Sequence, residues 1–144
     1  MEGIEISDLH LAKKLRETKT IAVIGCSDKQ YRTSYHIAKY LKKAGYDILP
    51  VNPNIQSSLG VKAYGTILEI PKNRQVDIID IFRNKRYSAE MVEEIVKWSK
   101  KTGQKPLIWT QLDVSTDRAK EIALNAGLPY VENRCLMVEH GRLL

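Results

Sequence analysis

Long apolar segments are absent from this sequence, and no run approaches the roughly 20 residues of a transmembrane helix. Cysteine is scarce: Cys26 and Cys135 stand far apart, with no CxxC spacing and no histidine cluster beside them. This argues against a metal site and against a secreted disulfide scaffold. Residues 1–5 are acidic where a signal peptide would be basic. We therefore expect a cytoplasmic protein with no membrane partner.

Acidic residues are in the minority, with 17 Asp and Glu against 23 Lys and Arg, which leaves a net charge of +6. Such an excess attracts anions. The basic residues are spread along the chain, however, whereas a nucleic-acid-binding protein usually concentrates them in one stripe. We favour a phosphorylated small molecule over nucleic acid as the partner, and keep a basic nucleic-acid-binding protein as an alternative.

The 144 residues, of which 43% are apolar, suffice for a single domain over 1–144 with its own core. Five short runs rich in β-branched residues are typical of strands buried on both faces of a parallel sheet. They cover residues 20–24, 46–51, 76–82, 106–110 and 129–131. Helical spacing of apolar residues predicts helices over 7–17, 33–44, 88–102 and 115–126.

This alternation of strand and helix predicts an α/β domain with a doubly wound, Rossmann-like parallel sheet and helices on both faces. Right-handed crossovers favour the strand order 3-2-1-4-5. We also expect a short extra strand near residues 136–138. The leading helix, within residues 1–18, is expected to pack on the domain through Leu9, Ala12 and Leu15.

The loop after the first strand is the candidate site, because ligands of such sheets bind beyond the carboxyl ends of the strands, at the switch point. Gly25 permits a sharp turn and a close approach of the backbone to a ligand. Ser27 offers a hydroxyl group, and Lys29 and Arg32 supply positive charge. The helix that begins near Ser34 presents unpaired N–H groups. Together these features predict an anion cradle suited to a pyrophosphate.

Several familiar nucleotide motifs are missing from this loop. It has no GxxxxGK[ST] sequence, only one of the three glycines of GxGxxG, and no GxSxG elbow that would make Ser27 a nucleophile. NAD sites place an Asp or Glu about 20 residues beyond the glycine loop. Here the second strand ends in Asn52 and Pro53, and no carboxylate follows until Glu69. An NAD(P)-dependent oxidoreductase is therefore disfavoured, but it remains an alternative.

A set of short motifs lies in order at the predicted strand ends. It consists of Ile24-Gly25-Cys26-Ser27-Asp28-Lys29, Arg32-Thr33-Ser34-Tyr35, Pro50-Val51-Asn52-Pro53, Val76-Asp77-Ile78 leading to Phe82-Arg83, Trp109-Thr110-Gln111, and Asn133-Arg134-Cys135 with Glu139-His140. With these motifs the chain, from about Thr20 to its C-terminus, resembles the small single-domain CoA-binding proteins. That family is related to the N-terminal CoA-binding domain of the succinyl-CoA synthetase α subunit.

The resemblance implies a site for coenzyme A or acyl-CoA at the carboxyl ends of the strands. The residues implicated are Gly25, Cys26, Ser27, Lys29, Arg32 and Ser34 around the phosphates, Val51, Asn52 and Pro53 beside the adenosine, Phe82 and Arg83 at the adenine or a phosphate, and Trp109 and Gln111 along the pantetheine. The physical character of these residues agrees, because CoA carries several phosphate charges and arginine matches phosphate geometry.

The resemblance also limits what is expected. Cys26 stands where the family more often has alanine, and Asp113 where glycine is expected. The synthetase's catalytic histidine belongs to a second domain that these 144 residues lack, so neither ligase activity nor a catalytic residue is carried over. We expect a carrier, a sensor, or a subunit of a larger acyl-CoA enzyme, either as a homodimer or with a partner enzyme.

Overall fold

The computed structural model describes residues 6–144; the acidic residues 1–5, which we took to argue against a signal peptide, lie outside the described residues. The elements are α1 (Asp8–Glu17), β1 (Thr20–Ile24), α2 (Thr33–Lys43), β2 (Asp47–Val51), β3 (Ser57–Ser58), β4 (Val61–Lys62), η1 (Ile67–Glu69), β5 (Ile78–Ile81), η2 (Lys85–Tyr87), α3 (Ser88–Thr102), β6 (Leu107–Thr110), α4 (Asp117–Asn125), β7 (Tyr130–Val131) and α5 (Leu136–Leu143). Within residues 6–144, no helix is both long and apolar enough to cross a membrane.

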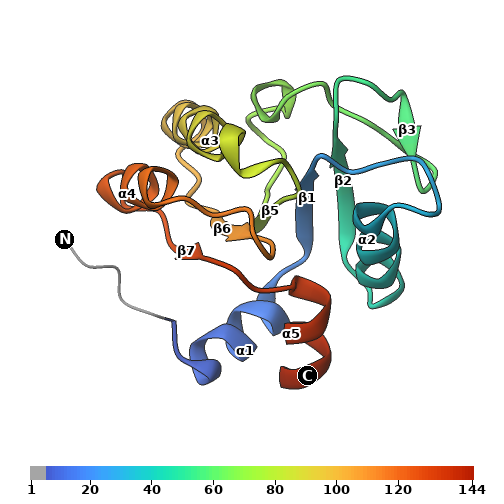
Figure 1. The fold of residues 1–144 in the computed structure, drawn as a ribbon, viewed down its shortest axis with the longest axis horizontal. Helices are drawn as coiled ribbons and strands as arrows, with labels where there is room; N and C mark the ends of the chain where they lie inside the picture. Colours follow the sequence, from blue (N-terminus) through green and yellow to red (C-terminus); the bar gives the residue numbers. More distant parts are fainter. Residues whose placement is uncertain (1–5) are drawn as a thin grey trace.

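A five-stranded parallel sheet forms the centre of the molecule, in the order β2-β1-β5-β6-β7 (Figure 1). The predicted class, a doubly wound α/β fold, is confirmed. The predicted order 3-2-1-4-5 is wrong, because the third run of the sequence pairs with β1 and β6 instead of lying beyond β2. The burial of β5 explains the difference. All of its residues are 0% exposed, which suits a central strand, and the predicted order would have left it at an edge.

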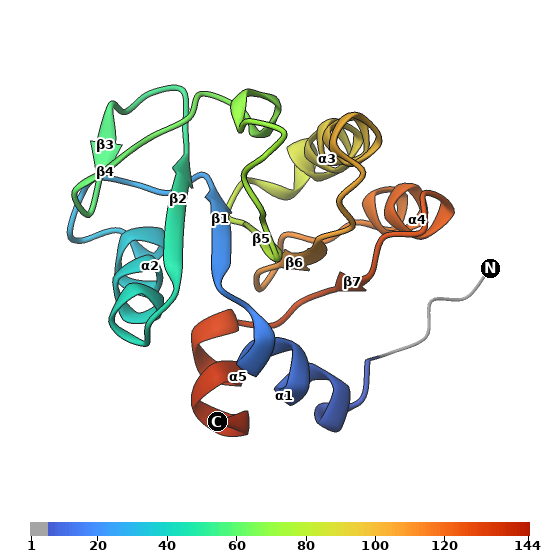
Figure 2. The ribbon, with the colours of Figure 1, turned by 180° about the vertical axis from the view of Figure 1, so that it is seen from behind.

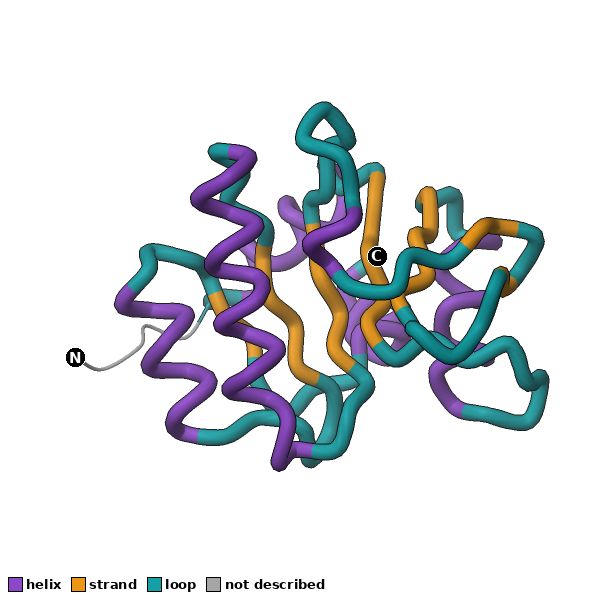
Figure 3. The backbone as a smooth tube through the Cα atoms, turned by 90° about the horizontal axis from the view of Figure 1, so that it is seen from above, coloured by secondary structure: helices purple, strands orange, loops and turns teal. Residues whose placement is uncertain are grey.

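Helices cover both faces of the sheet, as the sequence predicts. Helices α3 and α4, together with η1, pack on one face, and α2, α1 and α5 pack on the other (Figures 1 and 2). Each face has its own apolar cluster, one around Trp98 and the other around Trp109. Viewed from above, the strands lie side by side between these two layers (Figure 3). In Figure 1, β1 and β2 run upward, so their carboxyl ends lie at the top of the picture.

A small antiparallel hairpin, β3–β4, extends the structure beyond β2 and was not predicted. Its turn places Leu59 and Gly60 at φ +54° and +76°. Its strands have two residues each, so they carry no readable periodicity. The hairpin places Ser58 beneath the loop that follows β1, where Ser58 donates a hydrogen bond to the carbonyl oxygen of Ser27.

The C-terminal segment is helix α5, so the predicted short strand near residues 136–138 is wrong. Leu136 and Glu139 are buried, and their spacing of three residues is that of a helix face. Helix α1 packs beside α5 (Figure 2), as expected for a leading helix. Its buried residues are Leu11, Ala12 and Leu15, whereas Leu9, which was predicted to face inward, is 82% exposed.

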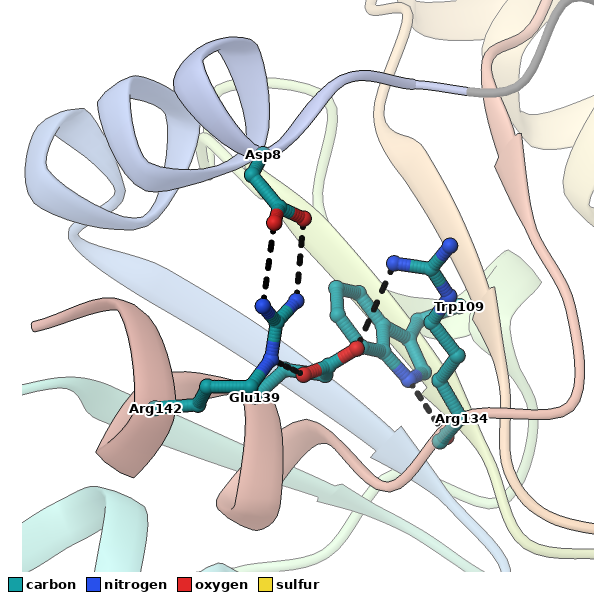
Figure 4. Close-up of polar contacts among 5 residues, drawn as sticks. All are labelled: Asp8, Trp109, Arg134, Glu139 and Arg142. Carbon is teal, nitrogen blue, oxygen red and sulfur yellow. Dashed lines mark hydrogen bonds and ion pairs between the residues drawn. The ribbon is translucent and has the colours of Figure 1, made fainter.

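An ion-pair network ties α1 to α5 (Figure 4). The carboxylate of Glu139 accepts a hydrogen bond from Arg142 Nε at 2.7 Å and lies 3.3 Å from Arg134 Nη1. The other two guanidinium nitrogens of Arg142 contact both carboxylate oxygens of Asp8, at 3.0 and 2.9 Å. Trp109 donates its indole N–H to the carbonyl oxygen of Arg134 at 2.8 Å. The segment between β7 and α5 is therefore held from several sides.

Replacement of Glu139 with glutamine is expected to lower the free energy of unfolding by about 1–2 kcal/mol, because it removes a buried anion that the guanidinium groups of Arg134 and Arg142 share. Urea denaturation measures this change. The control is Glu121→Gln, since Glu121 makes an exposed ion pair within α4 and its loss should change little. Equal stability of the two variants would contradict the structural role of the network.

Candidate functional site

The candidate site lies where β1 and β5 end, at the point where the sheet changes its winding direction. The connection after β1 leads to α2 on one face, and the connection after β5 leads to α3 on the other. This is the switch point at which ligands of open α/β sheets bind. The predicted loop after β1 is therefore in the expected place, although its neighbour across the switch point is the third run of the sequence and not the fourth.

Gly25 makes a turn that other residues cannot make at this position. Its N–H donates to the carbonyl oxygen of Val51 at 2.8 Å, and its φ is +83°. A Cβ atom on Gly25 would lie 2.2 Å from the carbonyl oxygen of Phe82. The loop backbone therefore passes tightly over the end of β5.

Polar side chains hold the rest of the loop in place. Asn52 Nδ2 donates to the carbonyl oxygen of Cys26 at 3.0 Å. The Ser34 hydroxyl oxygen accepts from the N–H of Ser27 at 3.0 Å, and the Ser27 hydroxyl oxygen accepts from the N–H of Lys29 at 3.0 Å. These residues were predicted for their contacts with a ligand. In the structure they fix the shape of the loop that was predicted to cradle an anion.

The amino end of α2 faces the same place. Arg32 is the N-cap residue and makes no side-chain cap, and the first turn carries no acidic residue. The helix was expected to begin near Ser34; it begins at Thr33, and Ser34 lies inside its first turn. The exposed Arg32 side chain adds charge to the positive end of the helix dipole.

A first cavity of about 520 Å³ opens beside this loop, on the face of η1 and α3. It brings together seven of the predicted residues, which are Gly25, Arg32, Val51, Asn52, Pro53, Phe82 and Arg83. Ile24, Ile67 and Met91 add apolar surface, and Asn54, Thr66 and Asn84 add polar groups. The volume falls in the range of about 300–1,000 Å³ that small-molecule sites occupy.

Basic and acidic side chains line different parts of this cavity. Arg83 lies close to the loop, with its Cδ 3.4 Å from where a Cβ on Gly25 would be, and its guanidinium group stacks 4.7 Å from the ring centre of Tyr87. Glu90 and Glu94 line the part formed by α3. Burial, and then the neighbouring charge of Glu90, raise the pKa of Glu94. An anion is therefore attracted to the loop side and repelled from the α3 side.

A second cavity of about 500 Å³ adjoins the first and shares Gly25, Arg32 and Phe82 with it. It includes the predicted residues Ser34 and Gln111. The Gln111 side chain is held in place, because its Oε1 accepts the N–H of Leu136 at 3.1 Å. The remaining lining consists of Tyr31, Thr33, Ile37, Leu112, Val114 and Cys135.

Four predicted residues are not among the described residues that line either cavity; these are Cys26, Ser27, Lys29 and Trp109. Trp109 is 0% exposed and packs in the core beside α1 and α5. Because Trp109 lies near the end of β6, it was predicted to line the site. Its side chain instead packs in the apolar cluster on the side of the sheet that α1, α2 and α5 cover. Lys29 is exposed on the loop.

The two cysteines are free thiols in different settings. Cys26 is 0% exposed, and its Sγ lies 3.9 Å from the hydroxyl oxygen of Ser58. Burial raises the pKa of Cys26 to about 11, so the group stays a thiol at neutral pH. Cys135 is half-buried and lines the second cavity. The packing of Cys26 suits a small residue in a tight loop better than a reactive thiolate.

Sequence reasoning missed the contribution of α3 to the first cavity. Tyr87, Glu90, Met91 and Glu94 all line it. A signal was present, because α3 begins shortly after β5 ends and residues spaced by three or four in its first turns share one face. The rim residues Tyr31 and Leu112 gave no such signal, since they sit in loops without periodicity.

A doubly wound parallel sheet with a glycine turn, a helix N-terminus and two arginines at its switch point defines an α/β domain of the Rossmann-like class. The comparison with known families is more specific. The chain belongs to the family of CoA binding domains, whose match covers residues 19–141. The resemblance drawn from the ordered motifs is thereby confirmed.

The chain is also similar to individual known proteins. The uncharacterized protein YneT of Bacillus subtilis is 32% identical over 135 residues, which are 94% of this chain and 95% of YneT. The structure of a hypothetical protein from Pyrococcus horikoshii has a TM-score of 0.87 and 35% identity, and the match covers 99% of each chain. The ADP-forming acetate–CoA ligase II of Archaeoglobus fulgidus is 35% identical over 80 residues, which are 54% of this chain and 11% of the ligase.

Proposed function

We propose that this protein binds coenzyme A, free or acylated, across the carboxyl ends of β1, β2, β5 and β6. The observation that carries the proposal is the pair of adjoining cavities that meet at Gly25, Arg32 and Phe82, in a chain of the CoA binding domain family. CoA has two unlike halves joined by a pyrophosphate, and the site has two unlike cavities joined by an anion cradle.

The character of each cavity favours one orientation of the ligand. The first cavity offers an aromatic ring, amide groups and carboxylates, which suit a base and a ribose. The junction offers Arg32, Arg83 and the N–H groups of α2, which suit phosphate. The second cavity offers Ser34 and Gln111 for the amides of pantetheine, among apolar side chains. Adenosine therefore lies in the first cavity, pyrophosphate at the junction and pantetheine in the second.

In the cell we propose a role as a carrier or sensor of CoA, or as a CoA-binding subunit of a larger acyl-CoA enzyme, in the cytoplasm and as a homodimer or with that enzyme. The raised pKa of Cys26 supports a binding role, because its thiol is not activated as a nucleophile. The match to a short part of an acetate–CoA ligase supports the role of a CoA-binding subunit of an acyl-CoA enzyme.

Calorimetric titration of CoA into protein freed of bound ligand tests the proposal. We expect saturable binding, and we expect Arg83→Ala to weaken it by roughly tenfold to a hundredfold, the effect of one charged hydrogen bond. Lys85→Ala is the matched control. Lys85 carries the same charge two positions away, but it pairs with Asp113 at 3.5 Å and is not among the described residues lining either cavity.

The alternatives make different predictions in the same experiment. Saturation by NADH or NADPH with no binding of CoA would overturn the proposal and favour an oxidoreductase. A salt-sensitive gel shift with nucleic acid, again without CoA binding, would favour the basic nucleic-acid-binding protein. Mass spectrometry of small molecules released by denaturation adds an independent check, since recovered CoA or acyl-CoA agrees with the proposal and a recovered nicotinamide nucleotide contradicts it.

A further inference from the structure

The second cavity has apolar side chains both in its deep part and at its mouth, beside the polar groups of Thr33, Ser34 and Gln111. Ile37 and Val114 are 3% and 7% exposed and form its deep part. Tyr31 and Leu112 are 83% and 61% exposed and form its rim. One part of the lining is therefore apolar from the buried end to the solvent.

The exposure of the two rim residues is unusual. Among the described residues, Tyr31 and Leu112 belong to the small set of large apolar side chains that are strongly exposed. They come from different loops, one before α2 and the other after β6, and the fold brings them to the same opening. Exposed apolar side chains gathered around a cavity mark a place where an apolar ligand is covered.

Charge near this opening disfavours an anionic ligand group. Among the described residues that line the second cavity, Arg32 is the one with a permanent charge, and it lies at the junction where the proposed pyrophosphate binds. Two nearby cations are engaged: Lys85 lies 3.5 Å from Asp113, and Arg134 lies 3.3 Å from Glu139. A carboxylate placed against Leu112 would exchange part of its water for an apolar side chain, and it would approach the exposed Asp113, the next residue along the chain.

We infer that the outer part of the second cavity holds the acyl group of an acyl-CoA, and that it selects uncharged, apolar acyl groups over those that end in a carboxylate. The inference rests on the proposed CoA binding, because the continuity of the two cavities is what leads the thioester end of the ligand to Leu112 and Tyr31.

The test compares two ligands of equal chain length, butyryl-CoA and succinyl-CoA, which differ in a terminal methyl group or carboxylate. Calorimetric titration into ligand-free protein is expected to give at least about tenfold tighter binding of butyryl-CoA, since each buried methylene group strengthens binding roughly fourfold and the carboxylate loses its hydration. Butyryl-CoA is also expected to bind more tightly than CoA.

Leu112→Ser assigns the effect to the cavity rim. This variant is expected to reduce the ratio of butyryl-CoA affinity to succinyl-CoA affinity to below about threefold, because the acyl group loses its apolar contact. The ratio is measured within one variant, so a change that affects CoA and both thioesters alike cancels from it. Leu112 is exposed, so the substitution leaves the core intact. Leu9→Ser is the matched control, because Leu9 is an exposed leucine on α1 and is not among the described residues that line the cavity.

The outcomes separate this inference from the function on which it rests. Binding of CoA with equal affinities for butyryl-CoA and succinyl-CoA would overturn the inference and leave the proposed function standing. A preference for butyryl-CoA that survives in Leu112→Ser would also overturn it, since the selectivity would lie elsewhere. Failure of CoA and of both thioesters to bind would overturn the proposed function itself.

Discussion

Gly25→Ala is expected to abolish measurable CoA binding and to lower the free energy of unfolding by about 2–4 kcal/mol. The new Cβ would stand 2.2 Å from the carbonyl oxygen of Phe82, and the φ of +83° is one that alanine adopts only with strain. The backbone must shift to remove the contact. Such a shift moves the loop that joins the two cavities and separates the N–H groups of the cradle from the arginines around it.

Gly127→Ala separates the two causes of this effect. Gly127 has a similar φ of +75°, but no atom lies within 4 Å of the Cβ position, so this variant carries the backbone strain without the clash. We expect it to lose about 1 kcal/mol of stability and to bind CoA normally. Urea denaturation and calorimetric titration of both variants give the comparison. Normal CoA binding by Gly25→Ala would mean that the close approach of the loop to β5 has no part in the site.

The fold class could be predicted because it depends on local patterns that the chain repeats. The predicted helices over 88–102 and 115–126 follow from the spacing of apolar residues, and α3 and α4 form there, with Gly103 and Gly127 just beyond their ends. The strand order could not be obtained in the same way, because pairing is decided by contacts between distant segments. The position of β5 between β1 and β6 follows from how completely it must be buried, and the sequence shows this only as one more apolar run.

Some residues of the candidate site could likewise be predicted from the sequence, and others could not. The residues after β1, β2 and β5 could be predicted because parallel strands bring their carboxyl ends to one edge, and the first cavity gathers them there. Trp109 shows the limit of that rule, since a residue inside a strand faces the side set by its parity and here faces the core. The rim formed by Tyr31 and Leu112 depends on how two loops meet, which no short-range pattern records.

Asp80 is expected to make the protein progressively less stable as the pH rises above about 4. This residue of β5 is 0% exposed and lies between Val23 and Trp109 on the neighbouring strands. Neither of its carboxyl oxygens has a hydrogen-bond partner among residues 6–144. Burial without a partner raises the pKa of Asp80 well above its ordinary value, so the folded protein holds it as a neutral acid.

The direction of the pH effect follows from where the proton is bound. Below the ordinary pKa of about 3.9, Asp80 is protonated in both the folded and the unfolded chain, and its contribution to stability is complete. Above that value the unfolded chain releases the proton and the folded chain keeps it. Stability then falls by up to about 1.4 kcal/mol for each pH unit, until the pH passes the raised pKa of the folded state.

Asp80→Asn should therefore equal the wild type in stability near pH 4 and exceed it by a growing margin as the pH rises toward 7, by up to about 1.4 kcal/mol for each pH unit. Asparagine has nearly the same shape and cannot ionise, so it keeps the burial and removes the titration. Urea denaturation at a series of pH values gives both profiles. The difference between them isolates Asp80, because the other groups with shifted pKa values, such as Glu132 and His140, are common to both proteins.

Asp113→Asn is the matched control, because it makes the same substitution outside the core. Its side chain is 86% exposed, and asparagine tolerates the φ of +58° at this position. The pH at which the Asp80→Asn difference levels off gives the pKa of Asp80 in the folded protein. A difference that does not vary with pH would require Asp80 to be ionised when folded. A buried carboxylate needs a compensating donor or cation, so that result would contradict the unpartnered environment in which β5 holds this side chain.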